Sequence, residues 1–199
     1  AITGGVLSTG LLTSGGTASG IGAASGSASN LVIDGGTLKY TGAALTWSRG
    51  FTIGTAGAGF DLSTASGQLH LSGGTNLGDG SGGATSLVKT GSGTLILSAA
   101  GNTYTGPLQV QAGTVQFGNA GPGGESTGVG HSVAISGGAE LKFRHASADT
   151  VTFNAPISGD GKVNFDYNNS AAGSGSLTLG GNNSFTGGLF TNYATSNFQ

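Results

Sequence analysis

Large apolar side chains recur along this chain in short groups, spaced two residues apart and separated by Gly, Ser, Thr and Asn. Examples are Leu31 and Ile33, Phe51 and Ile53, and Leu69 and Leu71. A period of two places these side chains on one face of an extended strand. No stretch of the chain has the apolar spacing of a helix. The pattern therefore predicts an all-β chain with nearly no helix.

The groups also repeat at longer range, most clearly around residues 87–118. This stretch predicts strands over 87–89, 94–98 and 108–117, the last broken at Gly113, and 175–187 repeats much of 93–106. A series of apolar groups that begins at Leu31 begins again at Val133. Shorter echoes, such as Leu69 to Leu95, are about 25 residues apart, and a fixed period of this size indicates a solenoid.

We therefore expect a parallel β-helix, or β-solenoid, with coils of roughly 25 residues. A sandwich of antiparallel hairpins is the rival, since regular short strands with turn signals also fit it. Stacked coils bury the same face in the same way, which explains the repetition. We expect one domain over 1–199, with an irregular or weakly stranded start (1–30), a first apolar series (31–86), a central repeat unit (87–132) and a second series that restarts the repeat (133–199).

The interior of this solenoid is predicted from the apolar alternation. Glycine pairs beside the groups suit its sharp corners, because glycine adopts positive φ without steric cost. Tyr104 and Phe185 hold equivalent positions in the two repeat copies, which favours packing over recognition through a hydroxyl. The predicted core and repeat residues are Leu38, Tyr40, Phe51, Ile53, Leu69, Leu71, Leu95, Leu97, Tyr104, Val115, Phe117, Ile135, Leu141, Phe143, Phe153, Phe165, Leu177, Leu179 and Phe185.

Composition narrows the class of protein. Glycine supplies 43 of 199 residues, roughly three times the usual share, yet there is no Gly-X-Y period. Charged residues are 7% and the formal net charge is −2, without a basic cluster for nucleic acid. The chain has no Cys and no apolar run long enough to span a membrane, and the pattern of its first residues does not predict a signal peptide. This composition suits an exported bacterial surface protein.

Candidate catalytic and metal-binding groups are sparse. The pentapeptide 124–128 matches the G-x-S-x-G nucleophile motif, but no helix follows it. Arg144, His145 and Asp149 are predicted to share a solvated loop, and Asp160 and Asp166 could pair as the acids of a polysaccharide-degrading β-helix. Residues 73–80 resemble a single degenerate copy of a calcium-binding repeat, and the three His have no metal-ligand spacing. We expect no enzyme activity, catalytic residue, cofactor or metal.

The repeat motif itself resembles a known family. The sequences GSGTLILS, GNTYTG and AGTV within 87–118, with weaker copies over 174–189, are similar to the autotransporter-associated β-strand repeat of bacterial surface passengers. The resemblance implies a parallel β-helix at the bacterial cell surface or outside the cell. It implies no catalytic residues, because the motif is architectural.

These observations predict a structural stalk or fibre segment with a role in adhesion or matrix building. Its partners would be neighbouring coils of a longer chain or identical protomers stacked head to tail. The alternative is a module that binds a glycan or host receptor through loops 99–106, 118–130 and 167–175 on one side of the solenoid. A polysaccharide-degrading enzyme is a third and weaker reading.

Overall fold

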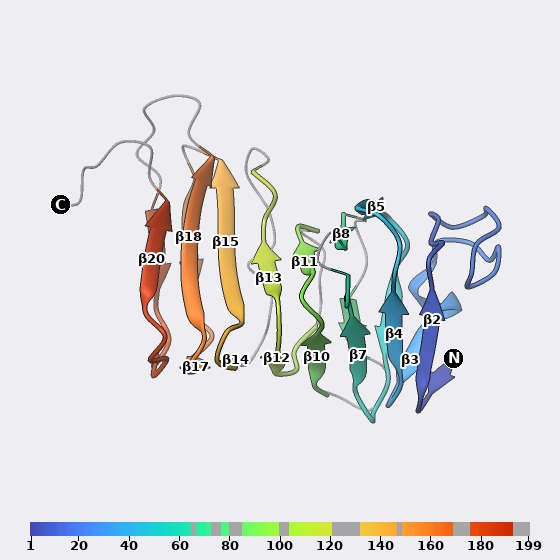
Figure 1. The fold of residues 1–199 in the computed structure, drawn as a ribbon, viewed down its shortest axis with the longest axis horizontal. Coiled ribbons are helices and arrows are strands. Elements are labelled where there is room, and N and C mark those ends of the chain that lie inside the picture. The colour runs from blue at the N-terminus through green and yellow to red at the C-terminus, as the bar shows by residue number, and fades with distance from the viewer. Residues whose placement is uncertain are drawn as a thin grey trace.

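The computed structural model describes residues 1–64, 67–72, 77–79, 85–99, 104–120, 132–146, 149–168 and 176–192, with the backbone alone at 77–79, 167–168 and 192. Every named pair of strands is parallel, and the helical content of this part is one 3-10 turn, η1 (Ala28–Asn30). The chain winds into a β-solenoid whose coils stack along the long axis, with β2 near one end and β20 near the other (Figure 1). The predicted all-β solenoid is confirmed.

Two long sheets, here called B and C, run along the stack. In hydrogen-bonding order, sheet B contains β2 (Val6–Thr9), β4 (Thr37–Tyr40), β7 (Ala58–Asp61), β10 (Leu87–Thr90), β12 (Leu108–Val110), β14 (Val133–Ile135) and β17 (Ile157–Gly159). Sheet C contains β5 (Leu45–Trp47), β8 (Gln68–Leu71), β11 (Thr94–Leu97), β13 (Thr114–Phe117), β15 (Glu140–Ala146), β18 (Lys162–Asn168) and β20 (Leu189–Asn192).

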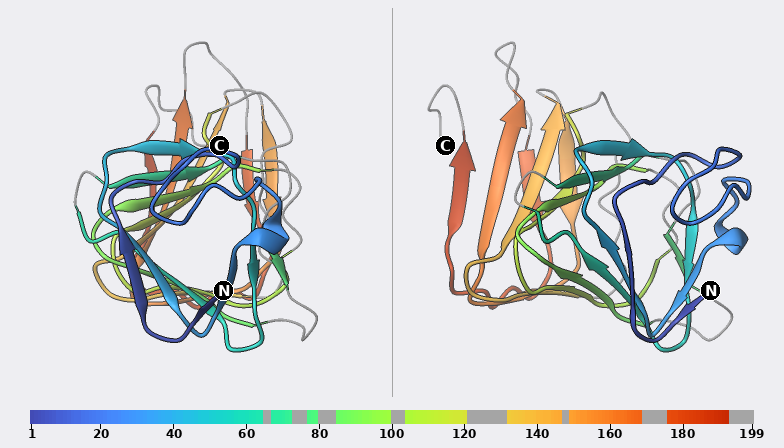
Figure 2. Two further views of the ribbon diagram at one scale, coloured as in Figure 1. Left: turned by 90° about the vertical axis from the view of Figure 1, so that its right-hand side faces the viewer. Right: turned by 45° about the vertical axis from the view of Figure 1, so that its right-hand side comes forward.

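A third face carries two shorter sheets. Sheet A contains β1 (Ile2–Thr3), β3 (Val32–Asp34), β6 (Phe51–Ile53) and β9 (Leu77–Asp79) in the first coils. Sheet D contains β16 (Thr150–Phe153) and β19 (Ser176–Leu179) in the last coils. Both lie between sheet C and sheet B in chain order, so a full coil visits three faces. Figure 2 shows the strands enclosing the axis when the stack is viewed from its N-terminal end.

Coil length follows from the register. Along sheet C, Leu69, Leu95, Val115 and Leu141 are successive partners, so the coil from 95 to 115 is shorter than the coils before and after it. The period seen in the sequence is thus the length of one coil. Because like positions stack, each coil repeats the inward and outward pattern of its neighbour.

The core lies inside the coils and contains the alternating apolar side chains. Leu38, Phe60 and Val110 from sheet B and Leu69 and Val115 from sheet C are all completely buried. Phe117, Phe143 and Phe153 form an aromatic cluster with ring centroids 5.1 to 5.6 Å apart, a spacing at which aromatic rings attract beyond simple burial. The interior is therefore a stack of matching side chains.

The segment that precedes β3 is only weakly stranded. After β1 and β2 the chain is irregular as far as η1, but it is attached to the stack. Leu12 is buried, and the buried Trp47 donates its indole N–H to the Thr13 carbonyl at 2.8 Å. One long-range tryptophan contact thus anchors a segment with little regular structure.

Three details differ from the sequence predictions. The expected strand 108–117 is two strands, β12 and β13, because Gly113 turns the corner between sheets B and C at φ +67°. The strand that begins at Glu140 continues to Ala146, so Arg144 and His145 belong to β15 and not to a loop. The two repeat copies occupy different faces: Leu95 lies in sheet C and Leu177 in sheet D.

Candidate binding surface

A glycine-rich corner joins sheet B to sheet C in successive coils. Gly91, Gly113 and Gly138 have φ values of +74°, +67° and +81° at this corner. Backbone hydrogen bonds continue through it, with the Thr114 amide bonded to the Gly93 carbonyl at 3.2 Å and the Glu140 amide bonded to the Gly113 carbonyl at 2.9 Å. Residues with side chains are strained at positive φ. The corner consequently exposes backbone where few side chains project.

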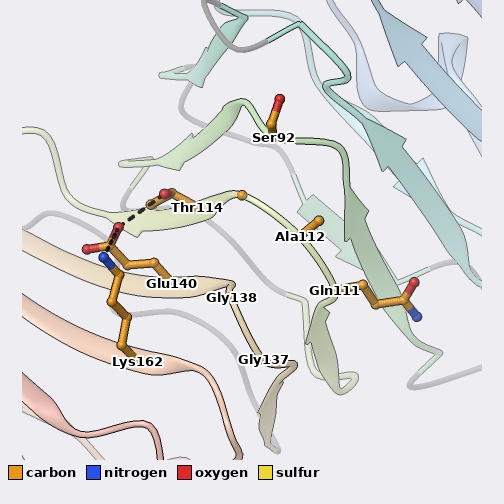
Figure 3. Close-up of a pocket in the computed structure, with 9 residues that line it drawn as sticks. Ser92, Gln111, Ala112, Thr114, Gly137, Gly138, Glu140 and Lys162 are labelled. Carbon is orange, nitrogen blue, oxygen red and sulfur yellow. Dashed lines mark hydrogen bonds and ion pairs between the residues drawn. The ribbon is translucent and has the colours of Figure 1, made fainter.

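A shallow hollow of about 420 Å³ follows this corner (Figure 3). Gly113, Gly137 and Gly138 lie along it, and the polar side chains around it come from Ser92, Gln111, Thr114, Glu140 and Lys162. These residues belong to four successive coils. The hollow is thus a property of the stack, which no single coil could form.

Glu140 contacts three side chains of the neighbouring coils. Its register partners in the neighbouring coils are Thr114 and Lys162. Oε2 accepts a hydrogen bond from Thr114 Oγ1 at 3.3 Å and lies 3.6 Å from Lys162 Nζ, while Oε1 accepts from Asn164 Nδ2 at 2.7 Å. The Glu140 side chain is 16% exposed and that of Lys162 is 48% exposed. Three contacts therefore fix the carboxylate, while the ammonium stays accessible.

Other charges on the outer faces also pair between coils. Lys142 Nζ lies 2.6 Å from Asp166 Oδ2, and Arg144 Nε lies 3.7 Å from the same oxygen. On sheet B, Lys39 Nζ lies 3.3 Å from Asp61 Oδ2. Exposed pairs of this kind each contribute about 0–1 kcal/mol. In each pair a positive side chain of one coil lies beside a negative side chain of the next coil, so the charges on the outer faces largely cancel.

One lysine lies inside the solenoid. Lys89 is fully buried, in the inward row of sheet B between Phe60 and Val110. Nζ donates to the carbonyl oxygens of Thr90 at 2.7 Å, Gly91 at 2.8 Å and Ala112 at 3.1 Å, which join the corners of two coils. Burial lowers the pKa of Lys89 from 10.5 to about 8, and the negative charge of Asp61 acts in the opposite direction. This residue ties two successive coils of the central repeat unit together.

Tyr104 makes a second contact between coils. Its ring is buried, and its hydroxyl accepts a hydrogen bond from the Leu87 amide at 2.7 Å. As a donor, the same hydroxyl lies 2.6 Å from the Pro107 carbonyl and 2.7 Å from the Thr85 carbonyl. In the other repeat copy, Phe185 is partly buried, and Asn183 Oδ1 accepts from the Ile157 amide at 2.9 Å. Tyr104 is therefore not an exposed platform for a sugar.

The structure places most of the predicted core and repeat residues inside the stack. Leu177, Leu179 and Phe185 are partly buried against the core. The others are buried: Leu38, Tyr40, Phe51, Ile53, Leu69, Leu71, Leu95, Leu97, Tyr104, Val115, Phe117, Ile135, Leu141, Phe143, Phe153 and Phe165. Burial also raises the pKa of Tyr40, whose hydroxyl donates to the Ala43 carbonyl at 2.8 Å.

The candidate catalytic groups are separated or otherwise engaged. Arg144 lies on the outer face of β15 and His145 on the inner face, where it is buried. Asp149 accepts a hydrogen bond from the Ala146 amide at 3.2 Å. Asp160 lies in the turn before β18, whereas Asp166 lies well inside that strand, roughly 13 Å beyond its first residue. Arg144 and His145 thus lie on opposite faces of β15, and Asp160 and Asp166 are separated along the chain.

Several predicted features fall outside the described residues. These are the pentapeptide 124–128, His131 and the side chains of the calcium-like stretch 73–80. Most of the three candidate binding loops do so as well, although 99–106, 118–130 and 167–175 each begin at or near the carboxyl end of a sheet C strand. In the part of the chain that is described, no three His, Asp or Glu residues gather in a group that could hold a metal ion. No helix of that part is long and apolar enough to span a membrane.

Sequence reasoning missed Lys89 and the group around Glu140. The two-residue alternation places Lys89 on the same side as Leu87, and this signal was available. The contacts of Glu140 with Thr114 and Lys162 depend on the exact register of three coils. No local motif marks such a set.

Comparisons with known proteins agree with the fold. Residues 87–117 and 171–191 match the Passenger-associated-transport-repeat family. Over 180 residues, which are 90% of this chain and 5% of the relative, the chain is 37% identical to the adhesin BmaC autotransporter of Brucella suis biovar 1 (strain 1330). The chain thus spans 5% of the length of this curated relative. No solved structure matches. The chain is therefore similar to autotransporter passengers, as its repeat motif predicted, and both matches indicate a location at the bacterial cell surface or outside the cell.

Proposed function

We propose that this chain is a non-enzymatic structural segment of a bacterial extracellular surface protein, a length of stalk or fibre that serves adhesion. The observation that carries the proposal is the continuous parallel register of sheets B and C, each through seven strands. Each coil satisfies the backbone of the next, and six steps of about 4.8 Å extend the stack by roughly 29 Å. Stacking of this kind makes a rigid spacer.

The outer charges also support a structural role. Lys39, Lys142 and Lys162 each lie beside a carboxylate of an adjacent coil, so these charges match coils to one another. The similarity to a protein named as an adhesin, and to a passenger repeat, supports adhesion without catalysis.

The partners that we propose along the axis are further coils, either of a longer chain or of an identical protomer. Apolar side chains are exposed on the outermost strands of the described stack: Val6 at 64%, Leu189 at 54% and Phe190 at 50%. Parallel edges with exposed apolar groups are surfaces that a further strand can cover.

Replacing the loops in the full-length surface protein distinguishes between the two proposed roles, a structural stalk and a binding module that uses the loops. Residues 100–103, 121–131 and 169–175 are replaced by Gly-Ser segments of equal length, and cell adhesion is measured. Antibody labelling of intact cells verifies equal surface display. The stalk proposal predicts that adhesion is unchanged by the loop exchange. It also predicts that removal of the whole segment 1–199 shortens the fibre seen by electron microscopy. Loss of adhesion after the loop exchange, at equal display, would reject the stalk in favour of a loop-based binding module.

A further inference from the structure

The hollow at the corner of sheets B and C is open to solvent and large enough for a small ligand. Its volume of about 420 Å³ lies within the range of roughly 300–1,000 Å³ that is usual for small-molecule sites. An added Cβ at Gly138 would meet nothing within 4 Å, so the space above this residue is open. A ligand can therefore approach the backbone closely at Gly138, whereas a Cβ at Gly113 or Gly137 would meet the Gly93 carbonyl oxygen at 2.4 Å or the Asp160 carboxylate at 2.9 Å.

The polar groups beside this open space are held in place. Glu140 is fixed by Thr114 from the preceding coil and by Asn164 from the following coil. Lys162 Nζ lies 3.6 Å from the carboxylate and its side chain is 48% exposed. Figure 3 shows the Glu140 and Lys162 side chains directed toward each other on one side of the hollow and Gln111 on the other. Groups that are ordered before binding lose little entropy when a ligand arrives.

The charges of the site select the class of ligand. The Glu140 carboxylate and the Lys162 ammonium largely cancel at a distance, and the Asp160 carboxylate lies against Gly137, so anions are not attracted. At close range the Glu140 carboxylate accepts hydrogen bonds and the Lys162 ammonium donates them. A hydroxyl is both donor and acceptor. A ligand with several adjacent hydroxyls and no charge therefore satisfies this set best.

We propose that the corner hollow binds a neutral oligosaccharide through adjacent hydroxyl groups, with Lys162 as the principal donor and Glu140 as the principal acceptor. The site is separate from the loops that follow sheet C and does not depend on the role of the segment as a stalk. A shallow hollow without an aromatic platform binds weakly, at about millimolar concentration. Repeated engagement by many copies on one cell would raise the effective affinity.

The test is a titration of the chain 1–199 with neutral trisaccharides of glucose, galactose, mannose and N-acetylglucosamine, followed by amide chemical shifts. We expect at least one sugar to shift the amides of Gly113, Gly137 and Gly138 with a dissociation constant of about 1 mM. Lys162→Met should weaken this binding about tenfold, since a charged donor is lost. Trigalacturonate, which is anionic, should bind more weakly than the best neutral sugar.

The matched control is Lys39→Met. Lys39 also pairs with a carboxylate of the next coil, at 3.3 Å and with comparable exposure, but it does not line the hollow. Its loss should leave the dissociation constant unchanged. The proposal is overturned if no neutral sugar shifts the corner amides, if the two variants weaken binding equally, or if only trigalacturonate binds.

Discussion

The buried ammonium of Lys89 gives the sharpest prediction about stability. Lys89→Met keeps the length of the side chain but removes the donors to Thr90, Gly91 and Ala112. The Thr90 carbonyl also accepts from the Leu62 amide at 3.1 Å, so the loss falls mainly on the other two carbonyls. A buried polar group left without its partner costs about 1–3 kcal/mol.

Leaving two carbonyl groups without a donor costs about 2–6 kcal/mol. Part of this cost is offset because Met, unlike Lys, places no charge in the interior. We therefore expect Lys89→Met to lower the free energy of unfolding by about 2–4 kcal/mol. Urea denaturation followed by circular dichroism measures this change. Lys39→Met, which removes an exposed pair, should cost at most about 1 kcal/mol. A Lys89→Met variant as stable as the wild type would refute the reasoning, because the apolar interior would then have no need of the amine.

The remaining predictions concern pH and two other contacts between coils. Since the pKa of Lys89 is about 8 in the folded chain and 10.5 as its ordinary value, the unfolded chain binds more protons between these pH values. Stability should therefore rise across this pH range by at most about 3.4 kcal/mol in denaturation curves, and this rise should vanish in Lys89→Met. Tyr104→Phe removes the hydroxyl that donates to the Thr85 carbonyl, while the Leu87 amide keeps its hydrogen bond to the Pro107 carbonyl at 3.0 Å, so the change should cost about 0.5–1.5 kcal/mol; no loss in urea midpoint would contradict this. Gly113 and Gly138 both have positive φ, +67° and +81°, but a Cβ at Gly113 would lie 2.4 Å from the Gly93 carbonyl oxygen, whereas a Cβ at Gly138 would meet nothing within 4 Å. The melting temperature should therefore fall clearly more for Gly113→Ala than for Gly138→Ala.

The fold was predictable because its physical causes are local and repeated. Alternation of apolar and polar residues determined which side of each strand faces inward, as at Leu69 and Leu71. The period of the repeated groups predicted the coil, whereas Gly113, which we expected to be a break within one strand, is a corner between two sheets. These signals recur in each coil, so a wrong prediction for one coil does not change the predicted architecture.

The face on which each repeat lies was not predictable. The copies around Leu95 and Leu177 have similar sequences, yet they occupy sheets C and D. All three faces present an apolar inner side and end at a turn, so the same short motif fits any of them. The length of the intervening segments decides the placement, and this length varies from coil to coil.

The candidate site depended on register as well. Thr114, Glu140 and Lys162 are far apart in sequence and become neighbours only when β13, β15 and β18 align. A shift of one residue would turn Glu140 toward the core. The interior position of Lys89 is different, since the alternation implied it, but lysine is almost never fully buried unless it is paired.

Distances between spin labels along the outer face of sheet B test the stacked-coil architecture most directly. Thr37, Val88, Ala134 and Ser158 lie in one outward row, through the register of β4, β7, β10, β12, β14 and β17. With about 4.8 Å per coil, backbone separations of roughly 14 Å for 88–158, 19 Å for 37–134 and 24 Å for 37–158 are expected. Pulsed electron resonance on doubly labelled cysteine variants should show the mean distance rising in this order. Distances that do not rise with the number of coils, as in a sandwich of hairpins, would contradict the account.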